Sequence, residues 1–111
     1  MLASEKYVMP RAKIQDYLLK PGGKHAQEFF AVGYTPNDVE KLNRDIEAQF
    51  DESKATSFRK LPDGAERFTI IMELGITKKR PFLTVWQKNT AGEKPKFVTA
   101  HREKVQYVRV V

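Results

Sequence analysis

The apolar residues of the N-terminal half recur every three or four positions, which is the spacing of one face of an α-helix. This pattern predicts three helices within residues 10–50. The first begins at Pro10 and ends before the Pro-Gly-Gly turn at 21–23, and the second runs from residue 23 or 24 to Gly33. The third opens with Thr35 as its N-cap and Pro36 in its first turn. Their apolar faces consist of Ile14, Tyr17 and Leu18, of Ala26, Phe29 and Phe30, and of Val39, Leu42, Ile46 and Phe50.

The C-terminal half changes to short segments rich in β-branched and aromatic residues, which are typical of strands. We expect strands at residues 56–61, 67–74, 82–87, 96–101 and 105–110. The turns between them are too short for crossover helices, so the strands should pair as an antiparallel meander. The order predicts an α+β fold, with two to three N-terminal helices packed on one face of a four- to five-stranded antiparallel meander sheet. Residues 1–111 should form a single domain, with a helical part at about 10–50 and a sheet at about 55–110.

Charge adds a class of partner to this picture. The chain has 20 Lys and Arg against 14 Asp and Glu, a net charge of +6. This balance favours a polyanionic partner such as nucleic acid, an anionic membrane or an acidic protein. No segment has the features of a signal peptide or a membrane span, so we expect no membrane partner. With no Cys and only two His, neither a metal nor another cofactor is expected.

The first candidate for chemistry is the segment 20–25, in which a Pro-Gly-Gly turn lies between two lysines and a histidine follows. The start of a helix, where free backbone N–H groups favour an anion, is expected here. Lys20 and Lys24 would then bind and neutralise a phosphate, while His25 would act as acid or base. The alternative is that Pro-Gly-Gly is only a turn between helices and that His25 is an exposed polar residue.

The second candidate lies in the strands at 82–87 and 96–101. Alternation places Thr84 and Trp86 on one face of the first strand. In the second strand, Phe97, Thr99 and His101 should share a face. On an open sheet face, Trp86 would stack on an RNA base, Thr99 would orient a histidine, and His101 would transfer a proton. The strand register decides which face is open, and the alternative is that Trp86 belongs to the core.

Four further cations are candidates for holding the phosphates on either side of a cleaved bond. Three of them form a run in the loop before the strand at 82–87, and the fourth follows the strand at 96–101. They are Lys78, Lys79, Arg80 and Arg102. Basic side chains suit phosphate contacts because these contacts position a nucleic acid without reading its sequence. For the run at 78–80, a solvated turn is the alternative.

Several short motifs of the chain resemble those of an uncharacterised bacterial domain family. Members of that family occur at the C-termini of polymorphic and contact-dependent toxins and in phage-associated proteins. The similarity extends from Lys13 to His101. The motifs that carry it are Lys13-Ile14-x-x-Tyr17-Leu18-Leu19, Gly23-Lys24-x-Ala26-x-x-Phe29-Phe30, Gly33-Tyr34, Leu42, Thr84-Val85-Trp86 and Phe97-Val98-Thr99-Ala100.

That family is similar to the barnase, EndoU, colicin and RelE-like group, in which N-terminal helices pack against an antiparallel sheet. The resemblance implies a metal-independent ribonuclease that cleaves RNA through the 2′-hydroxyl, with Lys24, Trp86 and Thr99 at functional positions. It also implies a cytoplasmic location in the producing or target bacterial cell, and an acidic immunity protein as partner. RNA, with tRNA as one candidate, would be the substrate.

Together these observations predict a small basic toxin-type ribonuclease that works without metal by acid/base catalysis. Its catalytic residues would be Lys24, His25, Thr99 and His101. Its substrate-binding residues would be Lys20, Lys78, Lys79, Arg80, Trp86 and Arg102. The alternative is a non-catalytic binding module, of the immunity or phage accessory type, which docks a protein or nucleic-acid partner through the same basic face.

Overall fold

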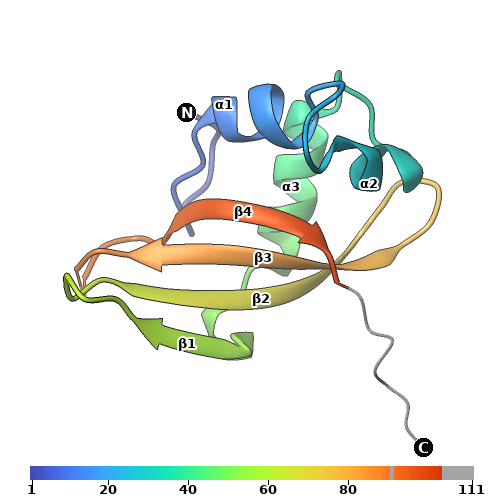
Figure 1. Cartoon of the computed structure of the whole chain (residues 1–111). Coiled ribbons are helices and arrows are strands. Elements are labelled where there is room, and N and C mark those ends of the chain that lie inside the picture. Colours follow the sequence, from blue (N-terminus) through green and yellow to red (C-terminus); the bar gives the residue numbers. More distant parts are fainter. Residues whose placement is uncertain (91, 104–111) are drawn as a thin grey trace, which may run out of the picture.

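A computed structural model of the chain describes residues 1–90 and 92–103. It has the predicted α+β fold, with the helices before the strands (Figure 1). The helical part comprises α1 (Arg11–Lys13), the π-helical turn η1 (Ile14–Leu18), α2 (Ala26–Ala31), α3 (Val39–Gln49) and the 3-10 turn η2 (Glu52–Lys54). The strands are β1 (Ser57–Lys60), β2 (Glu66–Leu74), β3 (Arg80–Lys88) and β4 (Lys96–Arg102).

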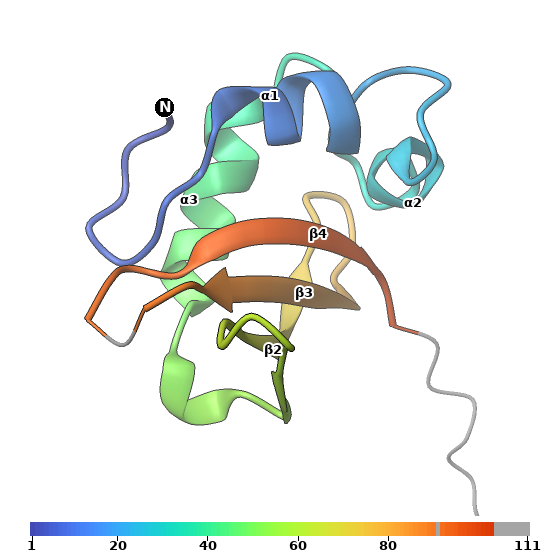
Figure 2. The same ribbon diagram turned by 60° about the vertical axis from the view of Figure 1, so that its left-hand side comes forward.

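The four strands form one antiparallel sheet in the order β1-β2-β3-β4, which confirms the predicted meander. The strand expected at 105–110 lies outside the described residues. Figures 1 and 2 place α3 across one face of the sheet, while α1 and α2 lie beside the edge strand β4. In the part of the chain that the structure describes, no helix combines the length and the apolar character needed to cross a bilayer.

The core lies between α3 and the sheet face that it covers. The predicted apolar stripe of the third helix, Val39, Leu42, Ile46 and Phe50, is buried. Alternate residues of the two central strands meet it, because successive side chains of a strand point to opposite faces. The buried side chains of these strands are Phe68, Ile70, Met72, Leu74, Phe82, Thr84 and Trp86.

Trp86 is fully buried, so the prediction that it binds substrate is wrong and the alternative of a core residue is confirmed. Its ring lies 4.8 Å from that of Tyr7, 4.7 Å from that of Phe50 and 5.3 Å from that of Phe97, measured between centroids. Its Nε1–H donates to Oγ1 of Thr84 over 2.8 Å. The indole ring is thus packed against other aromatic rings and its N–H is hydrogen-bonded inside the protein, so an RNA base cannot stack on it.

Two helices begin later than predicted. The third begins at Val39 with Asp38 as the N-cap residue, because the Asp38 carboxylate accepts hydrogen bonds from the backbone N–H and the hydroxyl of Thr35. Thr35 therefore belongs to a turn before the helix. The second begins at Ala26, and residues 20–25 form a turn of their own. Its predicted end is confirmed at Gly33, whose φ of +107° continues no helix.

An extra residue in β4 reverses the expected side-chain alternation. Trp86 pairs with Phe97, but its neighbour Val85 pairs with Thr99, so one residue of β4 bulges out. Phe97 therefore points into the core, whereas Thr99 and His101 point to the opposite, outer face of the sheet. The prediction that Phe97, Thr99 and His101 share a face is wrong. The bulge moves the two polar side chains to the face that α3 leaves open.

Candidate active site

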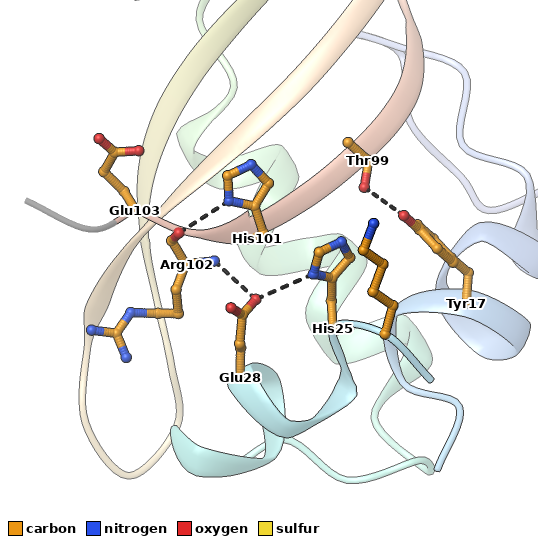
Figure 3. A pocket seen from close by; sticks show the side chains of 8 residues that line it. Tyr17, His25, Glu28, Thr99, His101, Arg102 and Glu103 are labelled. Carbon is orange, nitrogen blue, oxygen red and sulfur yellow. Dashed lines mark hydrogen bonds and ion pairs between the residues drawn. The ribbon is translucent and has the colours of Figure 1, made fainter. Parts of the chain in front are cut away.

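The two histidines of the chain meet between the start of α2 and the end of β4. The ring centroids of His25 and His101 lie 5.7 Å apart, with an angle of 29° between the ring planes (Figure 3). The His25 side chain is only 15% exposed. The alternative of an isolated, exposed His25 is therefore wrong, and the structure brings together two imidazoles from opposite ends of the sequence.

The turn before α2 determines the position of His25. The N–H of Gly23 donates to the carbonyl of Lys20 over 2.8 Å. A Cβ atom at Gly23 would lie 2.9 Å from that carbonyl oxygen and 3.1 Å from the carbonyl oxygen of Tyr17. Glycine is thus required because the turn packs closely on the end of η1. Pro-Gly-Gly is a turn between helices, as the alternative had it, and it fixes where His25 lies.

Contacts at both ends hold α2 against the sheet. At its C-terminal end, the carbonyl of Val32 accepts hydrogen bonds from the N–H groups of Ile76 and Thr77, over 2.7 and 3.0 Å. At its N-terminal end, Oε1 of Glu28 accepts a hydrogen bond from the backbone N–H of Arg102 over 3.1 Å. The helix that follows His25 is therefore tied to the strand that contains His101.

Each imidazole has one nitrogen next to an oxygen atom. Nδ1 of His101 lies 3.0 Å from the carbonyl oxygen of Arg102. Nδ1 of His25 lies 3.5 Å from Oε1 of Glu28. A carbonyl only accepts hydrogen bonds, so the contact with Arg102 places the proton of a neutral His101 ring on Nδ1. The Glu28 carboxylate favours the same tautomer at His25, over a distance that is long for a hydrogen bond. Among residues 1–90 and 92–103, Nε2 of neither ring has a hydrogen-bond partner, and both Nε2 atoms lie on the side away from Glu28 (Figure 3).

The Thr99 side chain is hydrogen-bonded to a tyrosine. Its Oγ1 lies 2.9 Å from the hydroxyl oxygen of Tyr17, so this bond joins η1 to β4. Among the described residues no hydrogen bond joins this hydroxyl to a histidine, so the orienting role predicted for Thr99 has no contact to support it, although the hydroxyl can still bond to a ligand. Lys13 supports the same contact: its Nζ lies 5.7 Å from the centre of the Tyr17 ring and donates to the carbonyl of Val98 over 3.1 Å.

We expect the Tyr17–Thr99 hydrogen bond to contribute about 1 kcal/mol to the free energy of unfolding, as is usual for a neutral pair. Tyr17→Phe and Thr99→Val should each lower that free energy by this amount in urea titrations. In the double variant, the second substitution should add little, because the pair is already broken. Fully additive losses would show that the two hydroxyls do not interact.

A cleft of about 650 Å³ opens beside the two histidines. Five predicted site residues line it: Lys24, His25, Thr99, His101 and Arg102. The other predicted cations, Lys20, Lys78, Lys79 and Arg80, are exposed and lie outside its lining. Lys20 is the first residue of the turn at 20–25, and the run at 78–80 belongs to the β2–β3 loop and the first residue of β3. Their predicted phosphate contacts would have to be made away from the cleft.

Three residues of the cleft were missed by the sequence analysis: Tyr17, Glu28 and Glu103. The sequence pattern places Tyr17 on an apolar helix face. In the structure its ring is half-buried and its hydroxyl reaches the cleft, where it contacts Thr99. For Glu28 a signal was present, because it follows His25 by three residues and so lies on the same face of a helix. The lining of the cleft thus contains two cations, Lys24 and Arg102, and two carboxylates, Glu28 and Glu103.

Arg102 keeps part of its hydrogen-bonding capacity free. Its buried Nε has no hydrogen-bond partner among the described residues, and its guanidinium lies 6.0 Å from the centre of the Phe82 ring. Within residues 1–90 and 92–103, no group of three or more His, Asp and Glu side chains is placed to hold a metal ion. The chemistry available from these side chains is proton transfer by imidazole, with cations that can bind an anion.

Comparison with known proteins gives a family and no named relative. A family model described as a domain of unknown function, DUF6883, matches residues 2–104. No curated protein and no solved structure has a significant match to the chain.

Proposed function

The chain belongs to the DUF6883 family, and we propose that its cleft is the active site of a ribonuclease that cleaves RNA by acid/base catalysis. The observation that carries the proposal is the pair of imidazoles, 5.7 Å apart, each with Nδ1 next to an oxygen atom. Cleavage of RNA through its 2′-hydroxyl needs one group that accepts a proton and one that donates a proton. Two histidines with free Nε2 atoms in one cleft can supply both.

In the proposed reaction, Nε2 of one neutral histidine removes the proton of the 2′-hydroxyl. The 2′-oxygen attacks the adjacent phosphorus, and the bond from phosphorus to the 5′-oxygen breaks. The other histidine, protonated at the start, gives its Nε2 proton to that leaving oxygen. The products are a 2′,3′-cyclic phosphate and a 5′-hydroxyl, and the two histidines have exchanged protonation states.

The cations of the cleft fit the charge that develops on the phosphate. Lys24 and Arg102 line the cleft beside the histidines, and both can stabilise the additional negative charge of the transition state. The carboxylate of Glu28 touches His25 and the backbone of Arg102. It therefore acts as a positioning residue, because it holds the His25 ring in one orientation and ties it to β4.

The direct test is to incubate the purified protein with total RNA and with tRNA in the presence of EDTA. We expect cleavage, with 5′-hydroxyl ends that polynucleotide kinase labels without prior phosphatase treatment. The matched control is the double variant His25→Ala, His101→Ala, which should leave the RNA intact. Equal cleavage by both proteins would contradict the assignment of the histidines. RNA binding without scission would instead support the non-catalytic binding module.

The toxin role and the acidic immunity partner are part of the same proposal. A ribonuclease acting on tRNA or total RNA should arrest growth when the chain is expressed alone in a bacterial cytoplasm, and the histidine double variant should be tolerated. The net charge of +6 supports an acidic partner that would cover the basic face of the protein. Normal growth with soluble, catalytically active protein would count against the toxin role and leave the ribonuclease assignment intact.

A further inference from the structure

A shallow groove of about 320 Å³ crosses the outer face of the sheet and begins at the proposed active site. Thr99 belongs to the lining of both the cleft and this groove, so the two are neighbours on the surface. The groove continues over all four strands. Its walls include Arg59, Arg67, Thr69, Val85, Val98 and Thr99.

The strand register arranges these side chains in two rows. Thr99 pairs with Val85, Val85 with Thr69, and Thr69 with Ser57, which gives a row dominated by hydroxyls. The adjacent row contains Arg59, Arg67 and Gln87. Residues two positions apart on a strand lie about 7 Å from one another, so the arginine row follows directly after the hydroxyl row.

A second hollow, of about 280 Å³, extends the groove toward the other end of β4. Arg67 and Val98 line both hollows. The extension adds Lys13 and Lys96 as cations. Nε of Arg67 donates to Oε1 of Gln87 over 2.8 Å, which holds the guanidinium on the sheet face. Among the described residues that line the two hollows there are four Lys and Arg side chains and no Asp or Glu.

Resting on the proposed function, we propose that this groove binds the backbone of single-stranded RNA on one side of the cleaved bond. Four cations without a carboxylate suit a row of phosphates, whereas the cleft itself has balanced charges. Val85 and Val98 offer apolar surface to unstacked bases, and the hydroxyl row offers hydrogen bonds to sugars. Since phosphate contacts carry no sequence information, the groove should increase the number of nucleotides that the protein binds without selecting their bases.

The test compares the double variant Arg59→Ala, Arg67→Ala with wild type on two RNA substrates. On an oligonucleotide long enough to cross the sheet, we expect kcat/KM to fall about tenfold or more, since two phosphate contacts are lost. On a dinucleotide, which reaches only the cleft, kcat/KM should stay unchanged. The charge-matched control is Lys6→Ala, Arg44→Ala, because Arg44 lies in α3 and Lys6 donates to the carbonyl of Glu47 near the end of that helix, away from the groove. This variant should behave as wild type on both substrates. An equal loss of kcat/KM on the two substrates, or no loss on either, would overturn the proposal that the groove binds RNA.

Binding of single-stranded DNA separates failure of the groove from failure of the proposed function. DNA lacks the 2′-hydroxyl and cannot be cleaved by the proposed reaction, so its affinity reports on binding without cleavage, and the salt dependence of that affinity reports on phosphate contacts. For the arginine double variant, we expect the slope of log K against log salt to become less steep by about 1.4, since each phosphate contact on a single strand contributes about 0.7. Arg59→Lys, Arg67→Lys should retain most of the slope and so exclude a folding defect. If the alanine variant has the same salt slope as wild type, the groove does not bind phosphates and the proposal fails, whether or not the protein cleaves RNA.

An acidic protein partner is the competing occupant of the same surface. If the two arginines bound only such a partner, the alanine variant would bind single-stranded DNA as tightly as wild type. It would also cleave both RNA substrates with the kcat/KM of wild type. That result would overturn the groove as an RNA site.

Discussion

His101→Ala should lower kcat for RNA cleavage by about 10²–10⁴-fold, which is the usual contribution of a general acid or base. The reason is local: its ring lies 5.7 Å from that of His25, and in the proposed reaction only these two rings exchange protons with RNA. KM should change much less than kcat, because Lys24 and Arg102 still line the cleft. Steady-state kinetics on a dinucleotide substrate, in EDTA, measures both quantities.

The pH profile separates loss of a proton-transfer group from a general defect. Wild type should show a bell-shaped dependence of kcat/KM on pH, since one histidine must be neutral and the other protonated. His101→Ala should lose one limb of the bell and keep the other. Glu28→Gln is the matched control at the same cleft: it should retain both limbs with a smaller loss of rate, because both imidazoles remain. A full bell in His101→Ala would contradict a proton-transfer role.

The parts of this fold that could be predicted are those that follow from the regular spacing of apolar residues along the chain or from the length of the connecting turns. The third helix shows this best, because Val39, Leu42 and Ile46 lie on one face whatever surrounds the helix. The meander followed from turns too short for a helical crossover. Both results depend only on local sequence and chain length, so no knowledge of tertiary contacts was needed.

The open face of the sheet could not be predicted, because a single inserted residue in β4 determines it. Without the irregularity next to Trp86, alternation would have put Thr99 and His101 in the core together with Phe97. No residue type near this position marks a bulge in the sequence. The candidate site therefore depended on a register that becomes visible only in the paired strands.

Tyr17 and Glu28 show a second limit of reading the sequence. Both lie on helix faces that also contribute apolar residues, and periodicity assigns such residues by position, without regard to their polar atoms. The Tyr17 hydroxyl contacts Thr99, and the Glu28 carboxylate contacts the N–H of Arg102. These contacts join segments more than seventy residues apart, with separations of 82 and 74 positions. Long-range partners of this kind follow from the packing of α2 against β4.

Trp86→Ala should lower the free energy of unfolding by about 3–5 kcal/mol, the usual cost of deleting a large buried side chain. The substitution leaves a cavity between Tyr7, Phe50 and Phe97, which line the ring on several sides. It also removes the donor that pairs with Thr84 Oγ1. Because a domain of this size has about 5–15 kcal/mol in total, the variant should be close to unfolding at room temperature. Denaturant titration followed by circular dichroism measures the loss.

The matched control is Phe58→Ala, since that aromatic ring is 66% exposed on the edge strand β1. It should change the free energy of unfolding by no more than about 0.5 kcal/mol, as surface substitutions usually do. Trp86 is the only Trp of the chain, so its fluorescence reports on this one site. We expect blue-shifted emission that single-stranded DNA does not quench by stacking. Strong quenching by single-stranded DNA, together with a stable Trp86→Ala variant, would contradict the buried position and show that Trp86 lies on a binding surface.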